Sequence, residues 1–439
     1  MRALIDQDVV DFLIVGDGGR EAAIADALGR SPRVGKIYVA GTSVLLERFK
    51  KVELIGINKL DINGLADFAK ANRVHLTFPG PEAPLAAGIA NLFWKLGLPL
   101  VGPSQAATRA ETNKIWALRR CEKYGVPTGW FCVFRSESNT LEFVRGRGFP
   151  IVIKYPYLAE GKGSFVCFSE GDANFAVSKI SELAAKNNIP TTFLVMEFLE
   201  GEEASITLFT DGKNEVYLPA SQDHKHLYEG DQGPMTGGMG AYAPAPIVTP
   251  QVQKAVHEQI ALRFLRGLEK EGIPYTGCLY IGGMITKNGP IARVVEFNCR
   301  PGDPEAQVVL PLVENFAEIL IATWNRTLDN LTVKTTGESA ACVVVASENY
   351  PDTPVIGRQI SDIGKAEDIC DNIYPSGIAR KKGRLVTNGG RIAGMTALED
   401  DLPTALDKAT AAADAFKFTR KQFRRDIGWK ARRLLEKRR

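Results

Sequence analysis

The densest group of chemically useful side chains lies between Arg293 and Gln307, where the sequence reads RVVEFNCRPGDPEAQ. Residues 294–298 have the pattern of a strand, so Glu296 and Asn298, two positions apart, lie on the same face. A carboxylate and a carboxamide oxygen are hard ligands that suit Mg²⁺ held jointly with nucleotide phosphates. The pair therefore predicts a metal site.

The turn after this strand contains two prolines and a glycine, and it carries Arg300, Asp303 and Glu305. An arginine can clamp a phosphate or a carboxylate through two parallel hydrogen bonds, and here two acids stand beside it. We take these three as candidate catalytic residues. The alternative for the whole stretch is a solvated strand end with a surface salt bridge.

The chain has 439 residues, of which 45% are hydrophobic and 24% charged, with a formal net charge of +3. At about 150 residues per domain, this length suggests roughly three domains. The composition is that of an ordinary soluble globular protein. Because the charges nearly balance, nothing draws the chain to nucleic acid or to a membrane, and we expect neither as a partner.

Seven cysteines are scattered along the chain without a C-x-x-C pair, which fits reduced cytoplasmic thiols better than disulfides or a zinc site. Asp6, Asp8 and Asp11 surround the start of the first apolar run, which argues against a signal peptide. No uncharged apolar run approaches the roughly 18 residues of a membrane span. We therefore expect a cytoplasmic protein.

The first hundred residues alternate between strand and helix patterns. The expected order is strand 9–15, glycine turn 16–21, helix 22–28, strand 36–40, helix 61–72, strand 75–78, glycine–proline turn 79–84, helix 85–96 and strand 98–101. This alternation predicts a doubly wound α/β domain in which the two turns meet at one crevice.

The glycine turn at 16–21 has three interpretations. The helix that follows it can receive an anion at its N-terminus, assisted by Arg20. A dinucleotide site is a weaker prediction, because Glu21 breaks the G-x-G-x-x-G pattern. The glycines can also serve the geometry of the turn alone.

The next segment begins with a helix pattern over 106–124, which carries Lys114, and continues in short strands and helices to about residue 198. A strand over 150–154 ends at Lys154 and precedes a loop at 158–164. The backbone N–H groups and the lysine of such a loop could close over phosphates. An ordinary glycine hairpin fits the same residues equally well.

A glycine-dense segment reads QDHKH at 222–226 and EGDQGPMTGGMG at 229–240. A stretch of this kind inside a compact domain is usually functional or disordered, and the apolar residues around Tyr242 favour an ordered site loop. His224 and His226 have no further ligand at zinc spacing, so no zinc site is predicted.

The second half of the chain contains an amphipathic helix over 249–271 and a hairpin whose strands cover 277–286 and 291–297, joined at Asn288 and Gly289. From about residue 335 short strands precede a helix over 402–416. The tail from 420 to 439 is basic. Because no aromatic platform accompanies its charges, we favour a solvated helix face over nucleic-acid binding.

In their order along the chain, the motifs resemble those of the glycinamide ribonucleotide synthetase (phosphoribosylamine–glycine ligase) family of ATP-grasp enzymes in purine biosynthesis. Besides Lys114, the matching motifs are GGRE at 18–21, GPEAPL at 80–85, GPS at 102–104, AEGKG at 159–163, QDHK at 222–225, GPMTGGMGAY at 233–242, TKNGP at 286–290, EFNCRPGDPE at 296–305, TNGGR at 387–391 and RRDIG at 424–428.

The resemblance implies an α/β and α+β multidomain fold. A doubly wound α/β domain would cover residues 1–106. An ATP-grasp domain would cover 107–334, with an inserted lid subdomain at about 127–196. A small mixed C-terminal domain would cover 335–439. ATP would lie between lid and core.

The resemblance also implies roles for individual residues. The ATP site would comprise Lys114, Lys154, Gly161, Lys162 and Gly163 at the phosphates, the backbone of Glu197 and Leu199 at adenine, and Glu203 at the ribose, with Glu296 and Asn298 holding Mg²⁺ or Mn²⁺. The amine substrate would be bound by Gly18, Gly19, Arg20, Glu21, Pro81 and Glu82. Glycine would be placed by groups from Arg300, Asp303 and the Asp223 segment. The implied catalytic residues are Arg300, Asp303, Glu305 and Asp223, and Gly237 and Gly238 would also bind substrate.

The implied reaction joins glycine to 5-phosphoribosylamine through glycyl phosphate, at the expense of ATP, and the implied state is a monomer or weak homodimer. Some residues depart from the family pattern. Ala22 replaces a histidine that the family has near the amine substrate, Met235 replaces an asparagine and Met196 an acid, and the lid root reads Tyr155-Pro156-Tyr157. The alternatives are therefore a divergent ATP-grasp paralogue that joins another carboxylate and amine, and a nucleotide-binding protein without catalysis.

Overall fold

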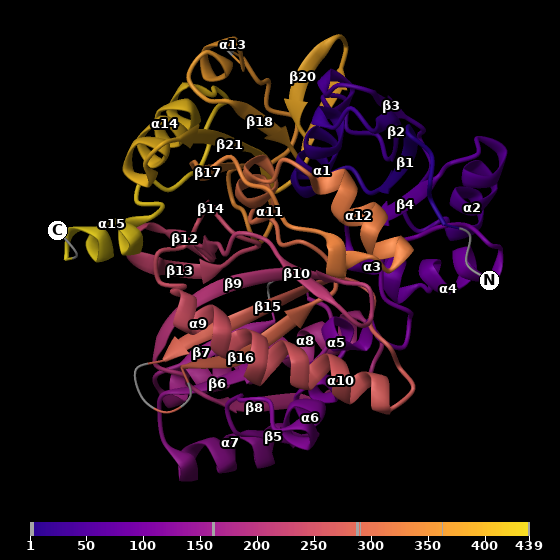
Figure 1. The fold of residues 1–439 in the computed structure, drawn as a ribbon. Coiled ribbons are helices and arrows are strands. Elements are labelled where there is room, and N and C mark those ends of the chain that lie inside the picture. Colours follow the sequence, from indigo (N-terminus) through magenta and orange to yellow (C-terminus); the bar gives the residue numbers. More distant parts are fainter. Residues whose placement is uncertain (1–3, 160–162, 287–288, 290, 362, 438–439) are drawn as a thin grey trace.

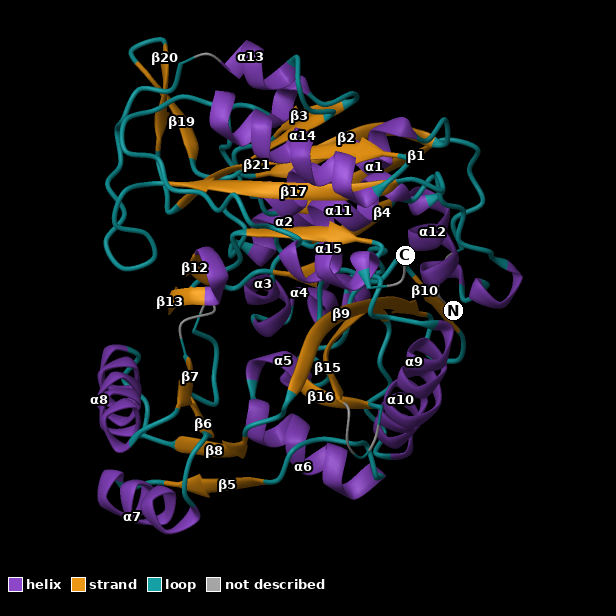
Figure 2. Ribbon diagram, turned by 90° about the vertical axis from the view of Figure 1, so that its left-hand side faces the viewer, coloured by secondary structure: helices purple, strands orange, loops and turns teal. Residues whose placement is uncertain are grey.

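The computed structural model describes residues 4–159, 163–286, 289, 291–361 and 363–437. The N-terminal elements and the C-terminal elements lie side by side, and a smaller group of helices and strands stands apart at the opposite end (Figures 1 and 2). Within the described residues, every helix is too short or too polar to cross a membrane.

The N-terminal sheet is parallel, with strand order β3-β2-β1-β4. Its strands are β1 (Val10–Val15), β2 (Val34–Ala40), β3 (Val52–Leu54) and β4 (Leu76–Pro79), and its main helices are α1 (Gly19–Arg30) and α2 (Ile62–Ala71). Leu100 adds a parallel bridge to Thr77. The predicted strand–helix alternation is therefore present.

Two predicted helices are interrupted in the structure. The expected helix 85–96 is divided into α3 (Glu82–Ala86) and α4 (Ile89–Lys95), because Gly88 adopts a left-handed conformation with φ of 89°. The expected helix 106–124 is divided into α5 (Arg109–Thr112) and α6 (Lys114–Tyr124). Asn113 separates them, and its side chain accepts the Trp116 N–H at 2.9 Å, so that α6 begins at Lys114.

The group that stands apart has its own hydrophobic core, and we call it the lid after the subdomain expected at about 127–196. Its antiparallel sheet has the order β5-β8-β6-β7, formed by β5 (Phe131–Phe134), β6 (Ile151–Lys154), β7 (Ser164–Cys167) and β8 (Phe193–Glu197). Helices α7 (Glu137–Arg147) and α8 (Glu170–Lys186) pack on it. Gly161 and Lys162, which were predicted to cover phosphates, lie outside the described residues.

The central sheet is antiparallel, with strand order β10-β9-β15-β16. Its strands are β9 (Gly201–Thr210), β10 (Glu215–Tyr217), β15 (Gly277–Thr286) and β16 (Ala292–Asn298). The predicted helix over 249–271 is present as α9 (Pro250–Ala255), a π-helical segment at Val256–Ala261 and α10 (Leu262–Lys270). Asn288, predicted in the hairpin turn, lies outside the described residues.

The C-terminal sheet has the order β11-β14-β17-β21-β18. Strand β17 (Ser339–Ala346) pairs with β14 (Gly240–Ala243) on one side and with β21 (Arg391–Glu399) on the other. The edge strands are β11 (Gln222–Asp223), which pairs with β14, and β18 (Asn372–Pro375), which pairs with β21, so the two ends of the glycine-dense segment belong to this sheet. The other α-helices and strands of the described residues are β12 (His226–Tyr228), β13 (Gln232–Met235), α11 (Ala306–Val309), α12 (Phe316–Asn325), α13 (Ile363–Glu367), β19 (Ile378–Lys381), β20 (Arg384–Thr387), α14 (Leu402–Ala415) and α15 (Trp429–Glu436). This sheet links two of the predicted domains, whose boundaries stay a prediction.

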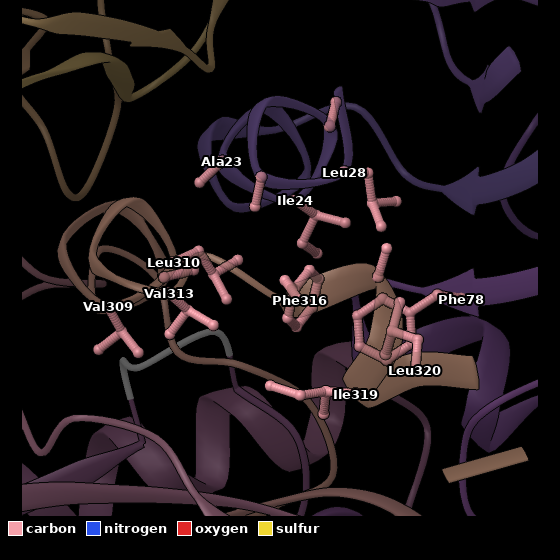
Figure 3. Close-up of a cluster of buried hydrophobic side chains, with 14 of the residues drawn as sticks. Ala23, Ile24, Leu28, Phe78, Val309, Leu310, Val313, Phe316, Ile319 and Leu320 are labelled. Atoms are coloured by element: carbon pink, nitrogen blue, oxygen red, sulfur yellow. The ribbon is translucent and has the colours of Figure 1, made fainter. Parts of the chain in front are cut away.

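Phe316 packs where three parts of the molecule meet (Figure 3). Its buried ring contacts Phe78 of β4 and Phe209 of β9, with ring centroids 6.2 and 5.8 Å apart. Phe316→Ala should lower the free energy of unfolding by about 3–5 kcal/mol, because it removes buried apolar surface and leaves a cavity. Denaturant titration measures the loss. Phe316→Leu, which keeps most of the volume, should lose clearly less, and equal losses would contradict this packing role.

Candidate active site

Residues from the N-terminal region, lid, central sheet, glycine-dense segment and C-terminal region line one cavity of about 570 Å³. The predicted site residues on its wall are Arg20, Pro81, Glu82, Lys114, Lys154, Gly163, Glu203, Asp223, Gly237, Glu296, Asn298, Arg300, Asp303 and Glu305. The cavity therefore gathers most of the predicted site residues, although they are spread over almost three hundred positions of the chain.

Some predicted residues lie elsewhere. Glu197 and Leu199 line a second cavity, of about 1130 Å³. The Glu197 carboxylate is occupied by Arg293, whose Nη2 lies 2.7 Å away. Gly18, Gly19, Glu21 and Gly238 do not line the first cavity either. The predicted direct contact of these residues with substrate therefore stays a prediction.

The glycine turn before α1 is built around Glu21. Its carboxylate accepts the Gly18 N–H and the Arg20 Nε–H, both at 2.7 Å, so it fixes Arg20 at the cavity wall. A side chain at Gly19 would meet Gln307 Nε2 and Ser376 Oγ at 2.7 Å. Close packing thus explains this glycine without any ligand.

Ala22 is fully buried in the hydrophobic core rather than on the cavity wall. The family's histidine at this position led us to expect a place near the amine substrate. Its replacement by alanine here removes no side chain from the wall of this cavity.

Glu296 and Asn298 of β16 both face the cavity. Burial acts to raise the pKa of Glu296, but Lys225, Lys154 and Lys114 outweigh it and lower this pKa to about 2. Within the described residues there is no group of three or more His, Cys, Asp or Glu that could hold a metal ion. An anionic carboxylate beside a carboxamide fits a divalent cation that takes its remaining ligands from phosphates and water.

Lys114 and Lys154, the two lysines predicted to bind phosphates, line the same cavity as Glu296 and Asn298. Lys114 Nζ donates to the Tyr157 carbonyl at 3.1 Å, and Lys154 Nζ donates to the Val295 carbonyl at 3.4 Å. Burial lowers the pKa of both lysines, and Glu296 opposes this shift. Their hydrogen bonds to carbonyls leave both ammonium groups able to bind an anion in the cavity.

Lys225 is a further cation on the wall, and our residue assignments from the sequence missed it. Its Nζ lies 2.9 Å from Glu203, the predicted ribose contact, and its pKa is held well above the ordinary value because Glu203 and Asp223 outweigh burial. Burial raises the pKa of Asp223 against the effect of Lys225. The QDHK motif contains both residues, so it was the signal that could have identified Lys225.

Arg300 sits between two carboxylates. Its Nη2 lies 2.9 Å from Glu111 and its Nε lies 3.3 Å from Glu82. Glu111 also accepts the Cys299 N–H at 2.7 Å, and burial raises its pKa to about 7. Nothing in the helix pattern over 106–124 distinguished Glu111, which the fold brings to Arg300 from almost two hundred residues away.

Asp303 is held by Arg391 of β21, at 3.0 Å, and accepts a hydrogen bond from Gln307 Nε2 at 2.7 Å. Arg391 also donates to the carbonyls of Gly237 and Asp303, both at 2.7 Å, so it ties the glycine-dense segment to this turn. Glu305 is buried and accepts a hydrogen bond from the Tyr280 hydroxyl, with 2.9 Å between the two oxygens. Arg391 belongs to the TNGGR motif but was given no role from the sequence.

At Gly238 the glycine-dense segment packs closely against the turn that carries Asp303, and a larger residue would not fit. The φ of Gly238 is 112°, and a Cβ would come within 2.4 Å of Pro304 Cδ. A side chain would therefore push the segment away from the turn that carries Asp303. This position supports the shape of the site.

His224 is buried beneath the C-terminal segment, where its Nε2 accepts the Gly428 N–H at 3.1 Å. Burial, Arg424 and Lys430 lower its pKa to about 3. An unfolded histidine titrates near 6.5, so the unfolded state alone binds this proton between pH 6.5 and 3. The stability that depends on neutral His224 is therefore lost as the pH falls below 6.5.

We expect the free energy of unfolding to fall by about 2 kcal/mol between pH 7 and pH 5 because of His224 alone. Denaturant titrations of the wild type and His224→Gln at both pH values measure this, and the variant should lose less stability with acid. The matched control is His226→Gln, which alters the partly exposed histidine two residues away and should keep the acid sensitivity. Equal acid sensitivity of the wild type and His224→Gln would contradict the prediction.

Residues of the lid sheet and of the antiparallel central sheet line the cavity, and the chain matches an ATP-grasp (A) domain, so it is an ATP-grasp ligase. Enzymes of this class use ATP and a divalent metal ion. More narrowly, the chain belongs to the phosphoribosylglycinamide synthetase family. The family's N domain matches residues 10–111, its ATP-grasp (A) domain 112–306 and its C domain 340–430.

Relatives support this assignment over the whole chain. The phosphoribosylamine–glycine ligase of Pasteurella multocida is 38% identical over 96% of this chain and 98% of its own length. That of Ralstonia nicotianae is 40% identical over 95% of this chain and 99% of its own. The trifunctional purine biosynthetic protein adenosine-3 of Gallus gallus is 38% identical over 95% of this chain, which spans only 42% of that protein.

Solved structures agree with the fold. The crystal structure of phosphoribosylamine–glycine ligase from Thermotoga maritima superposes with a TM-score of 0.80 at 28% identity, covering 95% of this chain and all of the other. Biotin carboxylase from Campylobacter jejuni has a TM-score of 0.68 at 14% identity, covering 94% of this chain and 93% of its own. The second likeness concerns the fold alone.

Proposed function

We propose that this chain joins glycine to 5-phosphoribosylamine with ATP, giving glycinamide ribonucleotide, ADP and phosphate. The observation that carries the proposal is the single cavity in which buried lysines, the Glu296–Asn298 pair and the Arg300–Asp303 turn face one another. The family membership and the full-length relatives named phosphoribosylamine–glycine ligase support the same reaction.

The proposed reaction has two steps. A glycine carboxylate oxygen attacks the γ-phosphorus of ATP, and ADP leaves. The amine nitrogen of phosphoribosylamine then attacks the carbonyl carbon of glycyl phosphate, phosphate leaves, and the nitrogen loses a proton. A carboxylate is a poor electrophile, so the phosphorylation supplies the leaving group that the second step needs.

The charged residues of the cavity have the chemistry that these steps require. Lys114 and Lys154 would hold the transferred phosphoryl group, with Lys225 as a further cation on the wall. Glu296 and Asn298 would hold Mg²⁺ or Mn²⁺, which neutralises phosphate charge when bound. Arg300 and Asp303 would orient glycine, with Glu305 and Asp223 beside them, and Arg20, Pro81 and Glu82 would receive the amine substrate.

The lid residues that line the cavity, Leu158, Ala159 and Gly163, stand where closure would exclude water from the acyl phosphate. We retain Glu197 and Leu199 as proposed adenine contacts and Glu203 as the ribose contact. For Glu203 this requires that its ion pair with Lys225 open or be shared.

The test is the release of ADP by the purified protein with glycine, with and without phosphoribosylamine, in Mg²⁺ or Mn²⁺. Release that requires both substrates is the expected result. One observation favours a second candidate, a paralogue with another substrate: Met235 places an apolar side chain on the cavity wall. A panel of amino acids and amines in the same assay distinguishes the two, since the paralogue would respond to a different pair.

A further inference from the structure

Arg424 is an arginine without solvent exposure, although it belongs to the basic tail that the sequence predicted to be solvated. Its Nε and Nη2 each lie 2.8 Å from the carboxylate of Asp426. Its Nη1 donates to Asp231 at 2.9 Å and to the His226 carbonyl at 3.1 Å. The prediction of a solvated helix face is thus wrong for Arg424. Its RRDIG motif has no role in the proposed reaction.

Two partners of Arg424, Asp231 and the His226 carbonyl, lie in the β12–β13 hairpin, residues 226–235, and further bonds join this hairpin to the C-terminal segment. Lys430 Nζ lies 2.8 Å from Asp231, and the Gly230 N–H donates to Asp426 at 2.8 Å. The Arg425 N–H donates to Glu229 at 3.2 Å. The turn of the hairpin is therefore fastened to the chain between Arg424 and Lys430.

The turn of this hairpin has a backbone conformation that needs support. Asp231 has a φ of 57°, in the left-handed region that residues other than glycine seldom occupy. Such a conformation costs free energy and persists where surrounding contacts hold it. Here Arg424 and Lys430 both bind the Asp231 side chain, so the contacts that anchor the hairpin also hold its least favourable residue.

The open end of the same hairpin lies at the cavity. Lys225 immediately precedes β12, and Met235, Thr236 and Gly237 end or follow β13; all of them line the cavity wall. Thr236 ties the two ends together, because its N–H and its hydroxyl donate to the Lys225 carbonyl at 2.7 and 2.8 Å. A displaced hairpin would therefore move Lys225 and Gly237 together.

We propose that Arg424 is a positioning residue for the ligation: by fastening the hairpin at residues 226–235 to the C-terminal segment, it keeps Lys225 and Gly237 in place on the cavity wall. The inference rests on the proposed function for its kinetic part only. Whether the hairpin is anchored by Arg424 is a property of the fold and can be measured without catalysis.

Two variants break the link from opposite sides. Arg424→Lys keeps the charge but cannot bond Asp426 through two nitrogens while also reaching Asp231 and the His226 carbonyl. Asp231→Asn removes the charge on the hairpin and leaves Arg424 paired with Asp426. The matched control is Arg425→Gln, which removes the neighbouring charge, a surface pair with Asp414, and keeps the backbone bond to Glu229.

Hydrogen exchange tests the anchor. Amides of residues 226–237 should exchange at least about ten-fold faster in Arg424→Lys and Asp231→Asn, while the N-terminal sheet and the lid are unchanged and Arg425→Gln behaves as the wild type. Unchanged exchange of the hairpin in both variants would overturn the proposal. If Arg424→Lys does not fold, Asp231→Asn decides by the same criterion.

Steady-state kinetics test positioning. The KM of at least one substrate should rise about ten-fold in both variants, and the double variant should lose little more than either single one, because both changes break one link. A merely structural loss would lower the active fraction and leave KM unchanged. A loosened hairpin with wild-type KM would therefore overturn the positioning role, whereas a wild type without substrate-dependent ADP release would refute only the proposed function.

Discussion

Glu296→Gln should reduce turnover about 100-fold or more, equivalent to roughly 3 kcal/mol in the barrier. Glutamine keeps the shape of the side chain and removes its negative charge. That charge faces Lys114, Lys154 and Lys225, which hold the carboxylate ionised, and it is the only anion of the proposed metal pair. The rate of ADP release at saturating glycine, phosphoribosylamine and Mg²⁺ measures the effect.

The matched control for this prediction is Glu53→Gln. Glu53 is an exposed strand carboxylate that forms a surface ion pair with Lys36 at 3.5 Å and does not line the cavity, so turnover should not change. The circular dichroism spectrum of Glu296→Gln should stay that of the wild type, whereas its unfolding midpoint should fall, because Lys114, Lys154 and Lys225 lose the charge that offsets theirs. An unaltered turnover number at saturating metal would remove Glu296 from the site.

The parts of the fold that local sequence pattern determines could be predicted. The strand expected at 277–286 is β15 with the same bounds, and the parallel alternation of the first hundred residues is present. In both cases an apolar run of strand length lies between turn residues, and that signal is contained in neighbouring positions. The breaks in the two interrupted helices were harder to predict from the sequence. Each depends on the backbone conformation of one residue, Gly88 or Asn113.

The partners of the charged residues could not be predicted. Arg300 is paired with Glu111, Asp303 with Arg391, and Arg424 with Asp231, each across a long stretch of chain. The sequence alone does not show whether a charged residue will be solvated or buried, because its partner is determined by the tertiary fold. This is why the basic tail was assigned to solvent and why Lys225 and Arg391 received no role.

Arg300→Met should destabilise the protein by about 3–5 kcal/mol in addition to abolishing the proposed ligation. Removing one partner of a buried ion pair leaves an uncompensated charge, and that loss is larger than the net value of the pair. Here two carboxylates, Glu82 and Glu111, would lose their shared cation. Denaturant titration at pH 7.5 measures the loss, with Arg109→Met as a control, because Arg109 is exposed on the same helix as Glu111.

A second substitution separates the unpaired charge from lost packing. Glu111→Gln removes the carboxylate charge while its carbonyl can still accept the Cys299 N–H, so Arg300→Met/Glu111→Gln should be more stable than Arg300→Met alone. The pH dependence provides an independent check. Burial already raises the pKa of Glu111 to about 7, above the ordinary value of 4.5, so the folded state binds this proton more tightly than the unfolded state.

Stability that depends on protonated Glu111 is therefore present at low pH and is lost as the pH rises through the folded pKa. Without Arg300 that pKa should rise further, because a cation that lowers it is gone. The deficit of Arg300→Met relative to the wild type should consequently shrink between pH 7.5 and pH 5.5. A deficit that stays constant with pH, and that Glu111→Gln does not relieve, would mean that Arg300 stabilises the fold through packing of its side chain rather than through its charge.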